Sequence, residues 1–166
     1  TLGTGSLANT GTLTVDGSTA VFDVGANSQT MAAVTLKNAG TLQGSGDLSS
    51  SAAFALQDGT VDVVLAGSAG ANKTTGGTVT LNKANTYTGV TDVSAGTLTL
   101  GTGSLASTGN LVVSGGTFDL VANNQTMATV QLTGGSINGT GALTSSAAAR
   151  RSPMSNSTGR MPGPSM

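Results

Sequence analysis

The chain of 166 residues contains no cysteine, histidine, tryptophan or glutamate. Without imidazole or thiol groups it has no histidine general base, no cysteine nucleophile, no disulfide and no His/Cys zinc site. Charged residues make up 8 % of the chain, against about 25 % in an average soluble domain. With a formal net charge of −1, the chain lacks the basic field that attracts nucleic acid, and we expect no nucleic-acid partner.

Long apolar runs are also missing. No run approaches the roughly 20 residues of a membrane-spanning helix, and Thr1 opens no signal-peptide pattern, so we expect any export signal to lie outside this sequence. What is abundant is glycine, serine and threonine, with valine and threonine filling the apolar stretches. These β-branched residues suit a pleated surface, so the composition predicts an all-β chain.

The chain repeats itself. The segment TLGTGSLANTG that begins at Thr1 returns as TLGTGSLASTG from Thr99, a displacement of 98 residues. The match continues, with short deletions, from FDVGANSQTMAAVTL to FDLVANNQTMATVQL and from GTLQGSGDLSSSAA to GSINGTGALTSSAA. The copies cover residues 1–98 and, as a partial second copy, 99–148. A fixed internal period of this kind indicates a repeat architecture.

Each copy consists of short alternating segments separated by Gly-, Asn- and Ser-rich turns. Alternation predicts strands with one apolar face at the segments 12–15, 21–24, 60–65, 78–81 and 97–100. Strands this short bury that face by stacking into coils around one apolar column. Coils of about 20 residues, typical of short-repeat solenoids, would give roughly five coils per 98-residue repeat. We therefore predict a β-solenoid over residues 1–149.

The last seventeen residues differ in composition. Residues 150–166 hold every arginine and every proline of the chain. Because such a segment buries too little apolar surface to offset its ordering, we predict a disordered tail or a junction with another sequence.

One stretch, GGTVTLNKANTYTGVTDVSAGTLTLG at residues 76–101, resembles the autotransporter-associated β-strand repeat of Gram-negative surface proteins. The resemblance rests on the alternating strand 78–81, the NTYTG segment at 85–89, the alternating stretch 90–93 and the AGTL segment at 95–98. Val90 stands where family members often carry a second small residue.

The resemblance implies that the solenoid is a right-handed parallel β-helix. It also implies an extracellular or cell-surface passenger, exported through the outer membrane with a C-terminal β-barrel that lies outside this chain. In that family the repeat is a structural element without catalytic residues. Thr1 matches Thr99, so we expect the chain to start partway through a longer array. We accordingly predict a non-enzymatic stalk or adhesin-like surface with an unidentified host-cell or surface ligand, and self-association through the solenoid ends.

A carbohydrate-active β-helix enzyme is the main alternative, because paired carboxylates hydrolyse glycosides. The only acids are aspartates, at positions 16, 23, 47, 58, 62, 92 and 119. Asp16 is replaced by Ser114 and Asp47 by Ala142 in the second copy, and only Asp23 persists, as Asp119. This pattern favours solvent-facing strand and turn residues over a catalytic pair. Calcium at the Gly44–Asp47 turn is disfavoured for the same reason, since the partner turn lacks the carboxylate.

Threonine pairs on a flat solenoid face could bind ice or a mineral surface. The pairs Thr12/Thr14, Thr78/Thr80 and Thr97/Thr99 recur at very unequal intervals, whereas an unbroken ladder needs one pair per coil. We therefore interpret these threonines as ordinary outward strand residues.

Aromatic and sulfur-containing side chains point to packing. Tyr87 could stack on a sugar, but a lone tyrosine in such a segment is typical of packing. Equivalent repeat positions pair Phe22 with Phe118 and Met31 with Met127, which indicates a shared core. We predict no catalytic, cofactor-binding or metal-binding residues and no cofactor.

Overall fold

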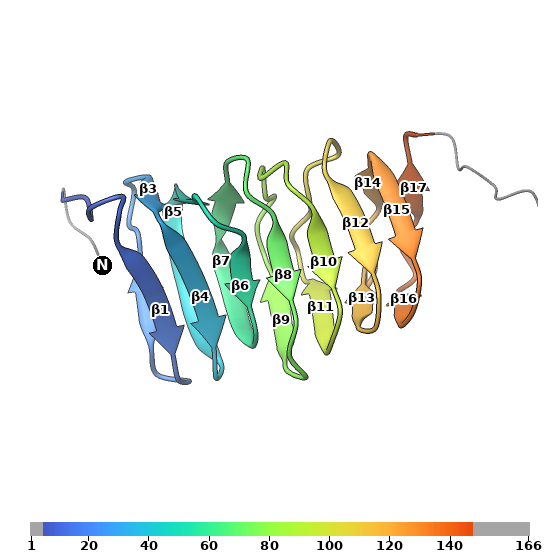
Figure 1. The fold of residues 1–166 in the computed structure, drawn as a ribbon, viewed down its shortest axis with the longest axis horizontal. Coiled ribbons are helices and arrows are strands. Elements are labelled where there is room, and N and C mark those ends of the chain that lie inside the picture. The colour runs from blue at the N-terminus through green and yellow to red at the C-terminus, as the bar shows by residue number, and fades with distance from the viewer. Residues whose placement is uncertain (1–4, 148–166) are drawn as a thin grey trace, which may run out of the picture.

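The computed structural model describes residues 5–147, and these form one all-strand solenoid (Figure 1). One sheet, called sheet A here, has seven parallel strands, one per coil: β1 (Thr12–Asp16), β4 (Ala33–Lys37), β6 (Phe54–Leu56), β8 (Ala71–Lys73), β10 (Thr91–Val93), β12 (Asn110–Val113) and β15 (Thr129–Leu132). The facing sheet B runs through β2 (Val21–Asp23), β5 (Gly40–Ser50), β7 (Gly59–Ala66), β9 (Thr78–Leu81), β11 (Thr97–Leu100), β13 (Thr117–Asp119) and β16 (Ser136–Asn138).

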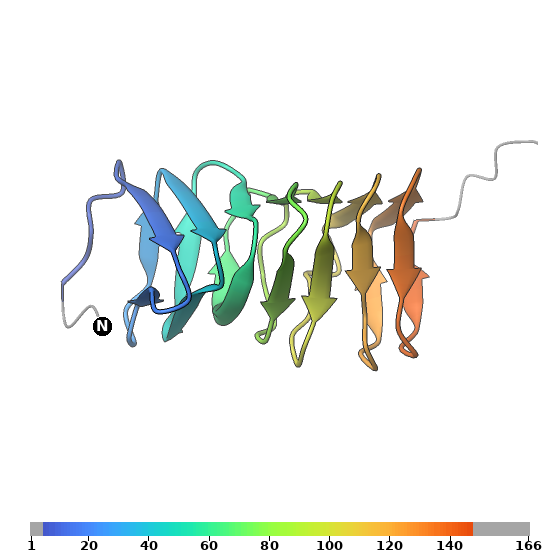
Figure 2. The same ribbon diagram turned by 90° about the horizontal axis from the view of Figure 1, so that it is seen from below.

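The solenoid is right-handed, as predicted. In Figure 1 the chain descends along sheet A at the front, ascends along sheet B at the back and advances from left to right. This is the hand that connections between parallel strands adopt almost always. Figure 2 shows the strands of each sheet side by side along the whole long axis. In the described part of the chain there is no helix long and apolar enough to cross a lipid bilayer.

The coils account for the sequence repeat. One ladder of sheet A joins Thr14, Thr35, Ala55, Asn72, Asp92 and Val112, one residue from each of six successive coils. Each step advances the chain by about 20 residues, the coil length expected of a short-repeat solenoid. Five steps carry the chain from Thr14 to Val112, which is the 98-residue displacement of the two copies. The predicted coil length and the predicted five coils per repeat are both confirmed.

The apolar core follows the predicted alternation. In β7 the side chains of Val61, Val63 and Leu65 are fully buried, and in β11 so are those of Leu98 and Leu100. These residues belong to one cluster that extends from Val15 in the first coil to Met127 near the last. Phe118 and Met127 are buried in it, Met31 is buried at the equivalent position, and Phe22 packs against it partly exposed. The shared core of the two copies is thus confirmed.

The third side of the coil is less regular than the two sheets. It contains β3 (Gln29–Met31), which pairs with the end of β5, and the pair β14 (Gln125–Met127) with β17 (Leu143–Ser145). Between these pairs the middle coils are joined by an isolated bridge from Ala84 to Ser104. The predicted tail, 150–166, lies outside the described residues, as do the outermost residues of the predicted solenoid 1–149 and of the second copy 99–148.

Candidate functional site

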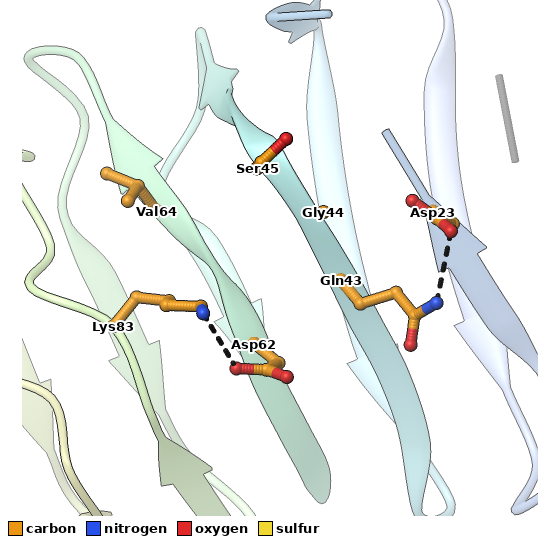
Figure 3. A pocket seen from close by; sticks show the side chains of 7 residues that line it. All are labelled: Asp23, Gln43, Gly44, Ser45, Asp62, Val64 and Lys83. Atoms are coloured by element: carbon orange, nitrogen blue, oxygen red, sulfur yellow. Dashed lines mark hydrogen bonds and ion pairs between the residues drawn. The ribbon is translucent and has the colours of Figure 1, made fainter. Parts of the chain in front are cut away.

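The outer face of sheet B carries a hollow lined partly by charged groups (Figure 3). It has a volume of about 540 Å³ and is lined by Asp23, Gln43, Gly44, Ser45, Asp62, Val64 and Lys83. The register between β5 and β7 shifts between Gln43 and Asp47, and Gly44 takes a φ of 137° there. A side chain at Gly44 would place its Cβ 2.4 Å from the Val24 methyl group. The hollow therefore results from a β-bulge that only glycine accommodates.

The polar groups of the hollow are paired with one another. Gln43 Nε2 donates to Asp23 Oδ2 at 3.1 Å, and Lys83 Nζ lies 3.5 Å from Asp62 Oδ1. The Lys83 and Asp62 side chains are about half exposed, so this ion pair contributes little to stability. The backbone amide of Gly25 donates to the second oxygen of Asp23 at 2.7 Å. Hydrogen bonds thus hold Asp23 in place, whereas Asp62 pairs with the half-exposed ammonium group of Lys83.

Asp23 and Asp62 are the two carboxylates that the fold brings to one hollow. They occupy one ladder with Gln43 between them, two coils apart, which is a backbone separation of about 9.6 Å. A carbohydrate-active enzyme would have to use this pair. Every other carboxylate of the sequence lies outside the hollow.

Those other carboxylates serve local structure. Asp58 accepts a hydrogen bond from the Thr78 amide at 3.2 Å, and Asp119 accepts one from the Val121 amide at 2.9 Å. Asp16 lies 3.0 Å from Lys37 Nζ. A hydrogen bond from Asn38, and then the Lys37 ammonium, lowers the pKa of Asp16. Asp92 accepts from Ser114 Oγ at 3.4 Å.

The turn considered for calcium is part of the bulge. Gly44 to Gly46 form the irregular stretch of β5, and the backbone amide of Asp47 donates its hydrogen bond to Ser28 Oγ at 3.1 Å. Within residues 5–147 no three acidic, histidine or cysteine side chains gather closely enough to hold a metal ion.

The threonine pairs divide between the two sheets. Thr12 and Thr14 lie on the outer face of sheet A, whereas Thr78/Thr80 stack directly on Thr97/Thr99 in sheet B. The stacking continues on both sides, because single threonines fill the neighbouring coils. One ladder runs through Thr41, Thr60, Thr80 and Thr99, and the next through Thr78, Thr97, Thr117 and Ser136. We call these eight residues the hydroxyl ladder.

The sequence interpretation of these threonines was incomplete. It required one Thr-x-Thr pair per coil and counted only complete pairs. Successive coils of sheet B are nearly equal in length, so an unpaired Thr41, Thr60 or Thr117 also falls into register with the pairs. Period alone did not reveal this, because which residue faces outward depends on the turn preceding each strand.

Comparison with family models, with curated proteins and with solved structures finds no match for this chain. The resemblance of residues 76–101 to the autotransporter-associated repeat therefore stays a prediction that rests on those residues alone.

Tyr87 lies in the core and not on a sugar-binding surface. Its side chain is 1 % exposed, its hydroxyl lies 2.8 Å from Thr91 Oγ1, and its ring packs against Phe54 with centroids 6.1 Å apart. Burial raises the pKa of Tyr87 to about 12, against the smaller opposing effect of the Thr91 hydrogen bond. The predicted packing role is confirmed.

Several buried polar residues were missed by sequence reasoning. Gln29, Lys73, Asn85 and Gln125 are all almost completely buried. Asn85 accepts from the Leu65 amide at 2.9 Å in the preceding coil and donates to the Ser104 carbonyl at 3.2 Å in the next. Recurrence of Gln in both copies, within QTM, was the available signal. An amide that recurs in both copies beside a core methionine indicates a polar group needed inside.

Proposed function

We propose that this chain is a non-enzymatic, extracellular segment of an autotransporter-type passenger, acting as a stalk with an adhesin-like polar surface. The observation that carries the proposal is that Thr14 and Val112, equivalent residues of the two copies, lie on the same ladder of sheet A. Because the sixth coil presents the same strand positions as the first, further copies can extend the rod at constant cross-section. The distance that the rod extends from a cell surface then depends on the number of repeats.

The coil architecture also suits export of an unfolded chain. Each coil pairs with its neighbours along the axis, so folding can proceed coil by coil as the chain emerges. The chain has no cysteine, so no disulfide can form in an oxidising compartment before translocation. A C-terminal β-barrel in the full-length protein would supply the exit.

Binding in this proposal uses extended surface. The outer faces carry threonine, serine, asparagine and aspartate, and the host-cell or surface ligand is unidentified. Among the described residues, β15 and β16 are the last strands of their sheets, and unpaired strand edges favour pairing with another molecule. Self-association through the ends predicts a sedimentation coefficient that rises with protein concentration, and a strict monomer at high concentration would contradict it.

The proposal is tested by displaying the chain on the surface of a bacterial cell. The chain is placed between a secretion signal and an outer-membrane β-barrel translocator in a Gram-negative cell, and surface exposure is measured by added protease and by antibody. We expect the solenoid to reach the surface in a protease-resistant form. The control replaces it with a helical domain of equal length that folds quickly. Retention of the solenoid inside the cell, at the level of this control, would overturn the proposal.

A further inference from the structure

The hydroxyl ladder is a two-dimensional array. Thr78 pairs in register with Thr97, and Thr80 with Thr99, so hydroxyl-bearing residues occupy both columns in two successive coils. Each column spans four coils. The column of Thr80 and Thr99 extends to Thr41, and the column of Thr78 and Thr97 extends to Ser136. Neighbours along a column are about 4.8 Å apart, and neighbours along a strand about 6.6 Å apart. Eight hydroxyl groups thus lie on one repeating surface lattice.

The side chains of the array are available to solvent and stiff. All eight residues are partly or well exposed. Apart from the contact of Thr117 Oγ1 with Ser136 Oγ at 3.2 Å, none of them has a side-chain hydrogen bond to another described residue. Threonine is restricted at χ1, so each of the seven threonines presents a hydroxyl and a methyl group in a fixed orientation. Such an array is already ordered before any ligand arrives, which lowers the entropic cost of binding.

The opposite face of the molecule has no such order. The corresponding ladder of sheet A runs through Thr14, Thr35, Ala55, Asn72, Asp92 and Val112, and only the first two of these carry the same kind of side chain. Both faces have the same coil spacing. The regularity of the hydroxyl ladder is therefore a property of its residues and not an automatic result of the fold.

Charge and aromatic content narrow the choice of ligand. Three carboxylates border the ladder: Asp58 beside Thr78, Asp62 beside Thr60 in β7, and Asp119 next to Thr99 in the following coil. No charged residue lies within it. The single tyrosine is buried, and a sugar surface is usually bound by stacking on exposed aromatic rings. What remains is a neutral lattice of hydroxyl and methyl groups with two fixed spacings. Water molecules hydrogen-bonded to such groups take up the same two spacings.

We propose that the hydroxyl ladder binds the surface of crystalline water. The hydroxyl groups hold water molecules at intervals similar to those between the oxygen atoms on a face of ice. The layer of bound water therefore joins the crystal. This activity is independent of export and of the passenger proposal. A solenoid can carry it on one face whatever compartment it occupies.

The test measures how the 166-residue chain distributes between slowly growing ice and the remaining liquid. Thr80→Lys/Thr99→Lys places two long charged side chains at the centre of the ladder. The matched control Thr14→Lys/Thr35→Lys places the same two side chains on adjacent coils of sheet A. Thr80→Val/Thr99→Val keeps the side-chain shape and removes two hydroxyl groups. It tests the same prediction if the lysine variant fails to fold. Circular dichroism checks the fold of each.

We expect the natural chain to be enriched in the ice several-fold over an inert globular protein. The Thr80→Lys/Thr99→Lys variant should fall to the level of that protein, the valine variant should lie between, and the sheet A variant should match the natural chain. Exclusion of the natural chain from ice would overturn the proposal. Equal losses from both lysine variants would overturn it too, as would retention on crystalline cellulose without incorporation into ice, which would assign the ladder to a sugar surface.

Discussion

The side-chain amide of Gln125 pairs with both backbone polar groups of Leu105 in the preceding coil. Gln125 Oε1 accepts from the Leu105 N–H at 2.8 Å, and Gln125 Nε2 donates to the Leu105 carbonyl at 2.9 Å. The side chain thus takes the place of a neighbouring strand where the third side of the solenoid has none. In the first copy Gln29 accepts from the Leu7 amide at 2.8 Å, but within residues 5–147 its Nε2 has no partner.

Replacing Gln125 by leucine should therefore cost more than replacing Gln29. Gln125→Leu leaves two buried backbone groups of Leu105 without partners, at about 1–3 kcal/mol each, so we expect a loss of about 2–6 kcal/mol. Gln29→Leu breaks one partly buried bond and relieves an unpaired amide group, so we expect a loss of about 1 kcal/mol or less. Urea unfolding measures both. Equal losses would show that the two amides do not act as described.

Tyr87 offers a spectroscopic test of the core, because it is the only tyrosine and the chain has no tryptophan. The pKa of Tyr87 is raised to about 12 from 10.0. Phenolate absorbance should therefore appear in the folded protein only near pH 12, and in urea-unfolded protein near pH 10. The folded state retains the proton longer, so its stability is complete below pH 10 and declines as pH rises toward 12. Titration of the folded protein near pH 10 would contradict the buried position.

Lys73 lies in the apolar interior, in register with Val93, with its ammonium group directed to the carbonyls of Thr75 and Ala95. Burial lowers its pKa below 10.5, and the charge of Asp58 opposes this shift. Between the folded pKa and 10.5 the unfolded chain binds more protons, so stability rises with pH in that window.

The difference in unfolding free energy between the natural chain and Lys73→Met should therefore shift in favour of the natural chain as the pH is raised from neutral toward about 10. Lys37→Met, which removes a lysine from the partly exposed face of β4, corrects for the general loss of one positive charge. The same pH dependence in both variants would argue against a buried ammonium group at Lys73.

The fold was predictable from the sequence to a large extent, for a physical reason. Alternation in TVTL and TLTL fixed the strands Thr78–Leu81 and Thr97–Leu100 at their observed ends, because period-two burial is a local property. The 98-residue displacement required an integral number of coils. Neither signal depends on distant contacts. The right hand was predicted only through the resemblance of residues 76–101 to a known family, and it agrees with the general preference of parallel connections.

The surface could not be predicted in the same way. The hydroxyl ladder depends on how each turn sets the register of the next strand. Coil length is not constant on sheet A, where the step from Ala55 to Asn72 is shorter than the step from Thr14 to Thr35. The hollow at Asp23 and Asp62 depends on a single bulge in β5. Lys73 lies on the inward side of β8 with Ala71, whereas the charge of a lysine leads to the expectation of an exposed side chain. These features arise at irregular positions, so they can be found only in the three-dimensional structure.

The 98-residue repeat equals five coils in register. Spin labels at Thr14→Cys and Val112→Cys test it directly, since the natural chain has no cysteine and both positions face outward from sheet A. Five coils separate the backbones by about 24 Å, and we predict a narrow pulsed-EPR distance distribution centred near that value. A broad distribution, or one displaced by the spacing of a coil or more, would contradict it.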